Sequence, residues 1–254
     1  IGVTGTNGKT SCTQFIAQSL NALGRRCGVI GTLGVGLQGQ LQETGYTTPD
    51  AVFLQASLAQ LLADGADSVA MEISSQGLHQ GRVNGVAIET AVFTNLSRDH
   101  LDYHGNMDSY GDSKLRLFMK PGLKTAVVNA DDPFATKILN SLSTSVSSYT
   151  YSISDSRCSV YAKELTLVPS GFVAQVVTPW GEGELRGALL GYFNFSNALA
   201  VLTTLLTLPA RDDAQPEKVD LERLLLEIGR LKPVSGRMEI VGEHEDITAV
   251  VDYA

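Results

Sequence analysis

The sequence contains few of the residues that mark binding to nucleic acids or to membrane surfaces. Aromatic residues make up 7% of its 254 residues, and 19 Lys and Arg stand against 27 Asp and Glu, which gives a net charge of −8. An acidic, aromatic-poor chain without basic clusters lacks the charge that grips a nucleic-acid backbone or an anionic lipid surface. We therefore expect no nucleic-acid partner and no membrane partner. A small anionic ligand stays possible, because a local site can be positive on a protein that is negative overall.

Long apolar runs and cysteine motifs are missing as well. No run approaches the roughly 18 apolar residues that a membrane span requires, and the first residues lack the charged-then-apolar pattern of a secretion signal. The three cysteines, Cys12, Cys27 and Cys158, are odd in number and have no metal-type or redox-type spacing. We expect reduced thiols in a cytoplasmic protein without membrane insertion.

What the sequence does contain is an alternation of short apolar runs and helical patterns, typical of strand-helix-strand units around a parallel sheet. Strands are predicted at 1–3, 27–30, 68–73, 87–94 and 125–129, and helices at 9–23, 51–63, 108–119 and 133–142. Strict alternation at 160–167, 172–177 and 183–190 predicts a smaller antiparallel β excursion beside the main sheet. Further elements are predicted at 194–206 and 221–231 (helices) and at 236–241 and 247–252 (strands). The predicted class is α/β, with a mostly parallel sheet flanked by helices.

Residues 4–10, Thr-Gly-Thr-Asn-Gly-Lys-Thr, form a glycine-rich loop between a predicted strand and a predicted helix. In a phosphate loop, backbone N–H groups and the helix N-terminus bind phosphate oxygens, a lysine such as Lys9 neutralises β/γ-phosphate charge, and a hydroxyl such as that of Thr10 reaches Mg²⁺. The pattern departs from GxxxxGK[ST], because Val3 stands at the position of the first glycine. We interpret the loop as a nucleotide phosphate site in a P-loop-type fold; the alternative is a tight glycine turn with a solvated lysine.

An acidic residue, Glu72, ends the apolar run at 70–73. Charged residues rarely occupy such a run unless they are paired or bind a metal, and the carboxyl ends of parallel strands are where open α/β sheets place ligands. Glu72 is therefore a candidate magnesium ligand. The alternative is a buried structural carboxylate paired with a backbone donor or a basic side chain.

A third motif at 94–104, Thr-Asn-Leu-Ser-Arg-Asp-His-Leu-Asp-Tyr-His, again follows a predicted strand. A single histidine in a loop is usually solvated or structural, but a strand end dense in Asp and His, in a chain with a phosphate loop and Glu72, indicates a metal neighbourhood. Of the two histidines, we favour His100 over His104 as a ligand.

These segments, taken with three later ones, resemble the central ATP-binding domain of the Mur ligases. The resemblance rests on residues 5–10, 71–75, 94–105, 194–197, 236–239 and 251–254, in that order, and covers essentially the whole chain. Within the family, residues 47–49, 72–75 and 95–105 are most similar to the MurE type, the UDP-N-acetylmuramoyl-tripeptide synthetases. Gln76 departs from the pattern, since histidine is common there.

The resemblance implies a site. The ATP phosphates would contact Gly5, Thr6, Asn7, Gly8, Lys9, Thr10 and Ser11. Magnesium would bind to Thr10, Glu72, His100 and to Lys114, which in this family is carbamylated by CO₂. The UDP-linked muramoyl dipeptide would contact Thr47, Thr48, Ser74, Gln80 and Arg82. Asn197 would contact adenine, Asp252 the ribose and Arg237 the γ-phosphate, so that Lys9, Lys114 and Arg237 are the catalytic candidates.

Two of these residues have simpler local interpretations. From its surroundings in the sequence alone, Lys114 would be a solvated helix residue, and its role comes entirely from the resemblance. Asn194, which is in the same motif as Asn197, could be an ordinary helix N-cap.

The implied reaction is ATP-dependent amide-bond formation through an acyl phosphate in bacterial peptidoglycan synthesis. The expected partners are ATP, Mg²⁺, UDP-N-acetylmuramoyl-L-alanyl-D-glutamate and a diamino acid, either meso-diaminopimelate or lysine. We expect residues 1–254 to be the central domain of a monomeric enzyme of the bacterial cytoplasm, with the UDP-binding and amino-acid-binding domains outside this chain.

Two alternatives remain open. One is another ligase of the superfamily, of the MurF, MurC, MurD, folylpolyglutamate synthase or cyanophycin synthetase type. The other is a non-catalytic ATP-binding module. The joint presence of Glu72, His100, Lys114 and Arg237 argues against the second, because binding alone would not need all four.

Overall fold

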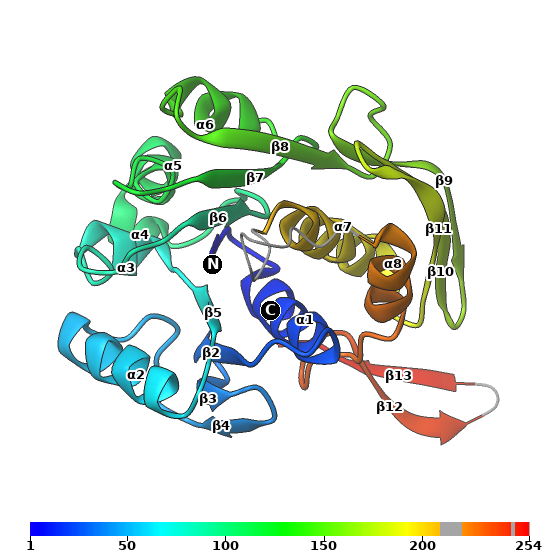
Figure 1. The fold of residues 1–254 in the computed structure, drawn as a ribbon, viewed down its shortest axis with the longest axis horizontal. Helices are drawn as coiled ribbons and strands as arrows, with labels where there is room; N and C mark the ends of the chain where they lie inside the picture. The colour runs from blue at the N-terminus through cyan, green and yellow to red at the C-terminus, as the bar shows by residue number, and fades with distance from the viewer. Residues whose placement is uncertain (209–219, 245–246, 254) are drawn as a thin grey trace.

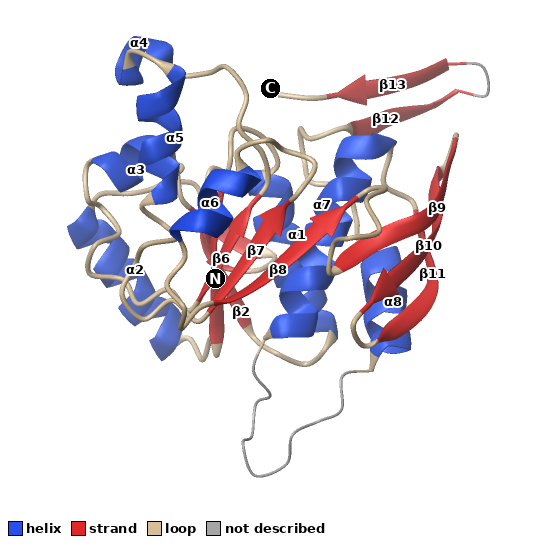
Figure 2. Ribbon diagram, turned by 90° about the horizontal axis from the view of Figure 1, so that it is seen from above, coloured by secondary structure: helices blue, strands red, loops and turns tan. Residues whose placement is uncertain are grey.

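In the computed structural model, which describes residues 1–208, 220–244 and 247–253, a single 11-stranded sheet carries helices on both faces (Figures 1 and 2). Its strands are β1 (Gly2–Thr4), β2 (Cys27–Gly31), β3 (Gly34–Leu37), β4 (Gln40–Gln42), β5 (Ser68–Glu72), β6 (Thr90–Phe93), β7 (Thr125–Asn129), β8 (Ser147–Ser152), β9 (Val160–Val168), β10 (Gly171–Thr178) and β11 (Gly181–Gly187). A separate hairpin is formed by β12 (Glu239–His244) and β13 (Ile247–Val251). The helices are α1 (Lys9–Ala22), α2 (Ala51–Ala63), α3 (Ser75–His79), α4 (Leu101–His104), α5 (Met107–Leu115), α6 (Ala135–Ser141), α7 (Gly191–Thr207) and α8 (Leu221–Gly229).

Strand β1 lies between β5 and β6, and both pairings are parallel. The strand order is β11-β10-β9-β8-β7-β6-β1-β5-β2-β3-β4. The chain therefore leaves β1 toward β2 and β5 on one side and reaches β6 on the other side later. The carboxyl end of β1 is a topological switch point, which is where open α/β sheets bind ligands. The glycine loop directly follows β1, so the fold places it at this point.

Two buried apolar clusters lie on opposite faces of the sheet. One includes side chains of α1, α7 and α8, and Figure 1 shows the curved sheet wrapping around these three helices. The other includes side chains of α2, α3 and α6. Along β7 the side chains alternate between them, since Val127 belongs to the first cluster and Ala126 and Val128 to the second. A strand buried on both faces is apolar throughout, as this segment is.

The predicted α/β class with a mostly parallel sheet is confirmed. Helix α2 and strand β7 have the bounds that the sequence predicted, 51–63 and 125–129. Helix α2 begins where it does because Asp50 caps it: its Oδ1 atom accepts hydrogen bonds from Val52 N at 3.0 Å and from Phe53 N at 3.1 Å.

The sequence missed several short elements. Helices α3 and α4 have five and four residues, which is too few for helical periodicity to show, and β3, β4 and β8 were not predicted either. The predicted antiparallel excursion is β9, β10 and β11, and it continues the main sheet, because Tyr151 of β8 pairs with Val160 of β9. Helix α7 begins at Gly191, so the local interpretation of Asn194 as the helix N-cap is wrong. The Nδ2 atom of Asn194 donates to Leu190 O at 3.0 Å.

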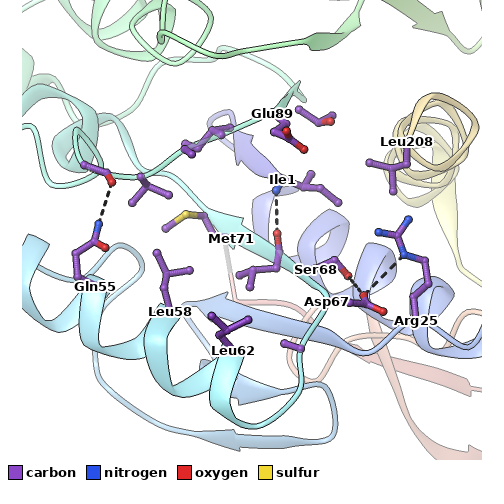
Figure 3. A pocket seen from close by; sticks show the side chains of 17 residues that line it. Ile1, Arg25, Gln55, Leu58, Leu62, Asp67, Ser68, Met71, Glu89 and Leu208 are labelled. Atoms are coloured by element: carbon purple, nitrogen blue, oxygen red, sulfur yellow. Dashed lines mark hydrogen bonds and ion pairs between the residues drawn. The ribbon is translucent and has the colours of Figure 1, made fainter. Parts of the chain in front are cut away.

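A cavity of about 480 Å³ lies at the amino ends of β1, β5 and β6, beside α2 (Figure 3). Its lining is largely apolar and includes Leu58, Leu62 and Met71, and the terminal amine of Ile1 donates to Val69 O at 2.8 Å. The cavity is at the opposite end of the strands from the glycine loop, so it does not contribute to a phosphate site. Among the described residues, no helix is both long and apolar enough to cross a membrane.

Candidate functional site

The glycine loop, residues 5–8, joins β1 to α1 and is held in shape by the segment after β6. Gly8 takes a left-handed conformation (φ 82°) as the N-cap of α1, which a side chain would disfavour, and an added Cβ would lie 2.6 Å from Asn197 Oδ1. Asn7 N donates to Asn95 Oδ1 at 2.9 Å, and Thr94 Oγ1 donates to Asn7 O at 2.5 Å. The segment after β6 thus fixes the loop, and Asn95 accepts the N–H groups of both Thr6 and Asn7. The N–H groups that would face an anion are those at the start of α1, where helical bonding begins with Cys12 N to Gly8 O.

Two lysines from different elements donate to the same carbonyl of this loop. Lys9 Nζ donates to Gly5 O at 2.9 Å and to Thr6 O at 2.7 Å, and Lys114 Nζ of α5 donates to Gly5 O at 2.8 Å. Lys114 is almost fully buried. Burial, and after it the positive charge of Lys9, holds the pKa of Lys114 well below its ordinary value. The surroundings of this amine therefore favour its neutral form more than those of a solvated helix lysine would.

Glu72 is buried at the carboxyl end of β5 and accepts hydrogen bonds from two neighbouring threonines. Thr10 Oγ1 donates to its Oε2 atom at 2.8 Å, Thr32 N donates to Oε1 at 2.8 Å, and Thr32 Oγ1 donates to Oε2 at 3.1 Å. Burial raises the pKa of Glu72, while these hydrogen bonds and the charge of Lys9 oppose the rise. The backbone donor that the structural alternative required is present, as Thr32 N.

The Glu72–Thr10 pair suits a small divalent cation. Mg²⁺ prefers oxygen ligands, and it usually binds one or two carboxylates together with substrate phosphates and water rather than a complete protein cage. A carboxylate oxygen and a hydroxyl oxygen 2.8 Å apart could supply two ligands of such a site. Among the described residues, no group of three or more His, Cys, Asp or Glu side chains is arranged to hold a metal ion.

Tyr110 of α5 connects the other candidate ligands to the loop. Its buried ring lies 4.4 Å from Lys114 Nζ and packs edge-on against His100 with the ring centroids 5.9 Å apart. Its hydroxyl lies 3.0 Å from Thr6 Oγ1. His100 is partly exposed with its Nε2 atom 3.5 Å from Asp99 Oδ2. Tyr110 therefore brings His100 and Lys114 together beside the loop.

His104, the histidine that we did not favour as a ligand, contacts two serine side chains. His104 Nε2 lies 2.9 Å from Ser75 Oγ, and its Nδ1 atom lies 3.4 Å from Ser113 Oγ. Both ring nitrogens thus have protein partners, and the imidazole joins α4 to α3 and α5.

We expect Tyr110→Phe to destabilise the domain by about 1 kcal/mol, because the hydroxyl makes a buried hydrogen bond to Thr6 that phenylalanine cannot replace. Burial raises the pKa of Tyr110 to about 12, so the folded protein favours the neutral phenol. The stabilising effect is complete below pH 10 and is lost as the pH rises from 10 toward 12, because the unfolded chain ionises first. Urea unfolding at pH 8 and at pH 11 measures both effects. Tyr46→Phe, at an exposed tyrosine, is the control and should change stability little; an equal loss in both variants would contradict this account.

The five residues predicted to contact the dipeptide lie together at the carboxyl end of β5. Thr48 Oγ1 donates to Glu72 O at 3.0 Å and accepts from Ser74 N at 2.9 Å. Arg82 Nη1 donates to Thr48 O at 2.6 Å, and Arg82 Nε donates to Gln80 Oε1 at 2.9 Å. Thr47 Oγ1 lies 3.0 Å from Thr32 Oγ1. An open cavity of about 390 Å³ adjoins them, lined by Tyr46, Asp50, Ala51, Gln80, Gly81 and Arg82.

The remaining ATP candidates are Asn197 on α7, Arg237 just before β12 and Asp252 just after β13. The side chain of Asn197 is buried against α1, where Cys12 Sγ lies 3.4 Å from its Oδ1 atom. Tyr253 N donates to Gly236 O at 2.8 Å, which ties together the two segments that carry Arg237 and Asp252. Burial lowers the pKa of Lys9, and the positive charge of Arg237 contributes to this shift. The structure thus places Arg237 near the loop.

Two contributors to the site were missed by the sequence. Thr32 donates twice to Glu72, and its position immediately after an apolar run was the available signal. Tyr110 had no such signal, because a tyrosine in a helix is usually an ordinary core residue.

The fold and the glycine loop define an α/β, P-loop-type domain. Residues 3–205 match the family model described as the Mur ligase middle domain. The chain belongs to the Mur ligase family.

Curated relatives agree with this assignment. The chain is 46% identical over 258 residues to a UDP-N-acetylmuramoyl-L-alanyl-D-glutamate--2,6-diaminopimelate ligase of Coxiella burnetii, covering 100% of this chain and 51% of that protein. It is 47% identical over 254 residues to the protein of the same name from Pseudomonas aeruginosa, covering 100% of this chain and 50% of that protein. The chain therefore spans about half the length of the curated relatives that it matches.

Solved structures show the same fold. A ligase structure with the same name superposes with a TM-score of 0.84 at 37% identity, covering 96% of this chain and 48% of that chain. MurF from Acinetobacter baumannii superposes with a TM-score of 0.76 at 20% identity, covering 99% of this chain and 49% of that one. The second likeness concerns the fold alone.

Proposed function

We propose that this chain is the central, ATP-binding domain of a ligase that joins 2,6-diaminopimelate to UDP-N-acetylmuramoyl-L-alanyl-D-glutamate. The observation that carries the proposal is that Glu72 and the buried amine of Lys114 both form hydrogen bonds to residues of the glycine-rich segment 4–10, Glu72 to Thr10 and Lys114 to Gly5. Relatives at 46% and 47% identity carry this activity in their names and are about twice as long. The domains that bind the uridine end and the amino acid would belong to the rest of such a protein.

The loop and its lysine would bind and orient ATP. Backbone N–H groups at the start of α1, ahead of the first helical bond from Cys12 N to Gly8 O, offer donors and positive potential to phosphate oxygens. Lys9 now donates to two loop carbonyls, and it would exchange them for the β/γ-phosphates. Arg237 would reach the γ-phosphate, where its guanidinium stabilises charge on the transferring phosphoryl group. Asn197 and Asp252 would contact adenine and ribose.

Glu72, the Thr10 hydroxyl and His100 would hold magnesium. Bound Mg²⁺ supplies charge neutralisation to phosphoryl oxygens. Glu72 suits this role because its raised pKa reflects a buried carboxylate short of positive charge, which a cation would relieve. The three hydrogen bonds from Thr10 and Thr32 fix its orientation in advance.

Lys114 would act as a carbamate. Its neutral amine nitrogen forms a bond to the carbon of CO₂, a C=O π-bond becomes a C–O⁻ bond, and the nitrogen gives up one proton. Only the unprotonated amine can react in this way, and burial supplies it by lowering the pKa of Lys114. The product presents anionic oxygens, which suit a hard cation far better than an ammonium does.

The reaction would pass through an acyl phosphate. The free D-glutamate carboxylate attacks the γ-phosphorus of ATP and ADP leaves; the amine of diaminopimelate then attacks the acyl carbon, loses a proton and displaces phosphate. Phosphoryl transfer depends mainly on positioning and charge neutralisation. Thr47, Thr48, Ser74, Gln80 and Arg82 would hold the acceptor beside the loop. Four of them, Thr48, Ser74, Gln80 and Arg82, already form a hydrogen-bonded group at the end of β5.

The complete ligase should release phosphate from Mg-ATP only when UDP-N-acetylmuramoyl-L-alanyl-D-glutamate and 2,6-diaminopimelate are both present. Residues 1–254 alone should bind Mg-ATP weakly and form no peptide bond, because the ordering of both other substrates would be missing. A phosphate-release assay with lysine in place of diaminopimelate serves as the control. Turnover driven equally by lysine, or robust ligation by residues 1–254 alone, would contradict the proposal.

A further inference from the structure

Tyr103 and its neighbours form a hydrogen-bonded chain that runs from the metal-ligand motif to the end of β5. Tyr103, in α4, is the third residue after His100 and is 41% exposed. Its hydroxyl accepts from Gln80 Nε2 at 3.0 Å and lies 3.0 Å from His79 Nδ1. Beyond Gln80 the chain continues through Arg82 to Thr48 O, with distances of 2.9 and 2.6 Å. Thr48 in turn donates to Glu72 O at 3.0 Å.

The orientation of the Gln80 amide follows from the chemistry of its partners. A guanidinium can only donate hydrogen bonds, so Arg82 Nε must face Gln80 Oε1, and the amide nitrogen must then face Tyr103. The Tyr103 hydroxyl accepts from this nitrogen, and its own proton is then directed to another partner, with His79 Nδ1 at 3.0 Å. An oxygen that can accept a hydrogen bond is thus needed at this point, because a group that could only donate would repel the amide nitrogen.

This arrangement leaves one N–H and one oxygen lone pair of Gln80 without a protein partner in these contacts. Gln80 and Arg82 also line the open cavity of about 390 Å³ at this edge of the sheet. A side-chain amide that is held at both ends loses little conformational freedom when it binds a ligand. The free donor and acceptor match a peptide or carboxylate group of an incoming molecule.

We propose that Tyr103 is a positioning residue for the acceptor substrate. Its hydroxyl accepts the hydrogen bond from Gln80 Nε2 and so holds the Gln80 amide in one orientation. The inference rests on the proposed function, in which Gln80 and Arg82 contact the muramoyl dipeptide. Tyr103 does not touch the substrate itself. Its effect therefore falls on acceptor binding, and the binding of ATP is unaffected.

The test is steady-state kinetics of the complete ligase with Tyr103→Phe. The change keeps the ring, which packs against His79 and His104 with centroid distances of 5.6 and 4.7 Å, and removes only the hydroxyl. The expected result is a rise of about three- to tenfold in KM for UDP-N-acetylmuramoyl-L-alanyl-D-glutamate, as expected for one lost hydrogen bond. The KM for ATP, the magnesium dependence and kcat should change by less than about twofold.

A double-mutant cycle separates this role from a structural one. Gln80→Ala should raise the acceptor KM, and Tyr103→Phe should add nothing further in that background, because the residue through which it acts is gone. Tyr149→Phe, which removes a hydroxyl on β8 where the ring lies against Trp180, is the matched control and should leave all constants unchanged.

Two results would overturn the inference while leaving the acceptor site intact. One is an unchanged acceptor KM in Tyr103→Phe although Gln80→Ala raises it. The other is a loss of kcat or a shift in magnesium dependence, which would mean that Tyr103 only supports the loop of His100. An unchanged acceptor KM in Gln80→Ala would instead show that the proposed contact between Gln80 and the acceptor is wrong, and the inference would fall with it.

Discussion

In the complete ligase, replacing Lys114 with Ala is expected to reduce turnover by at least about a hundredfold, the range seen when one preorganised electrostatic group is removed from an active site. Lys114 is buried, donates to Gly5 O at 2.8 Å and has a lowered pKa, so it can provide the neutral amine that forms a carbamate. Alanine would remove the anionic oxygens that we propose as part of the magnesium site. Phosphate release with the acceptor and 2,6-diaminopimelate both present measures the loss of turnover.

Chemical rescue distinguishes the carbamate from a lysine that only supports the loop. Formate or acetate should restore part of the turnover of Lys114→Ala by occupying the vacated anionic position, whereas guanidinium and alkylamines should not. Lys114→Met, which keeps the apolar length of the side chain, checks that the fold survives without the amine. Lys163→Ala, at an exposed lysine on β9, is the control and should turn over normally. Unchanged turnover in Lys114→Ala, or rescue by amines alone, would rule out the carbamate.

Replacing Lys9 with Ala should abolish productive ATP binding, with turnover again reduced by at least about a hundredfold. Lys9 directly follows Gly8, which has a left-handed conformation, and its amine donates to Gly5 O and Thr6 O. In the complex with ATP, phosphate oxygens would replace these carbonyls as its partners. Lys114 cannot take over this role, because it reaches Gly5 O from α5 and is buried there. Calorimetric titration of residues 1–254 with Mg-ATP measures binding without the rest of the enzyme.

Two variants make the Lys9 result specific. Lys9→Arg keeps the charge but replaces a compact ammonium with a planar fork, so it should bind ATP more weakly than the wild type and better than Lys9→Ala. Lys232→Ala removes an exposed lysine beyond α8 and should bind ATP normally. Near-normal affinity in Lys9→Ala would mean that residues 4–10 are a glycine turn with a solvated lysine and not a phosphate loop.

The sequence was most informative where local physics decides the structure. Strand β7 is apolar throughout because both of its faces are buried, and α2 begins after a capping aspartate; both elements were predicted with their observed bounds. Local patterns were weakest for short elements. Helices α3 and α4 have too few residues to show a period, yet they carry His79, Tyr103 and His104.

By itself, the sequence determined the α/β class, the glycine loop after β1 and the acidic end of β5, because glycine, lysine and a carboxylate at strand ends are local signals. The burial and the hydrogen bonding of Lys114 depend on tertiary packing. Its neighbours in the chain describe a solvated helix residue, but α5 packs against the loop and places its amine on Gly5 O. The hydrogen bonds from Thr32 to Glu72 and from Gln80 to Tyr103 likewise exist only in the folded chain. These contacts join residues 23 to 109 positions apart, and burial and hydrogen bonding across such separations depend on how the whole chain packs.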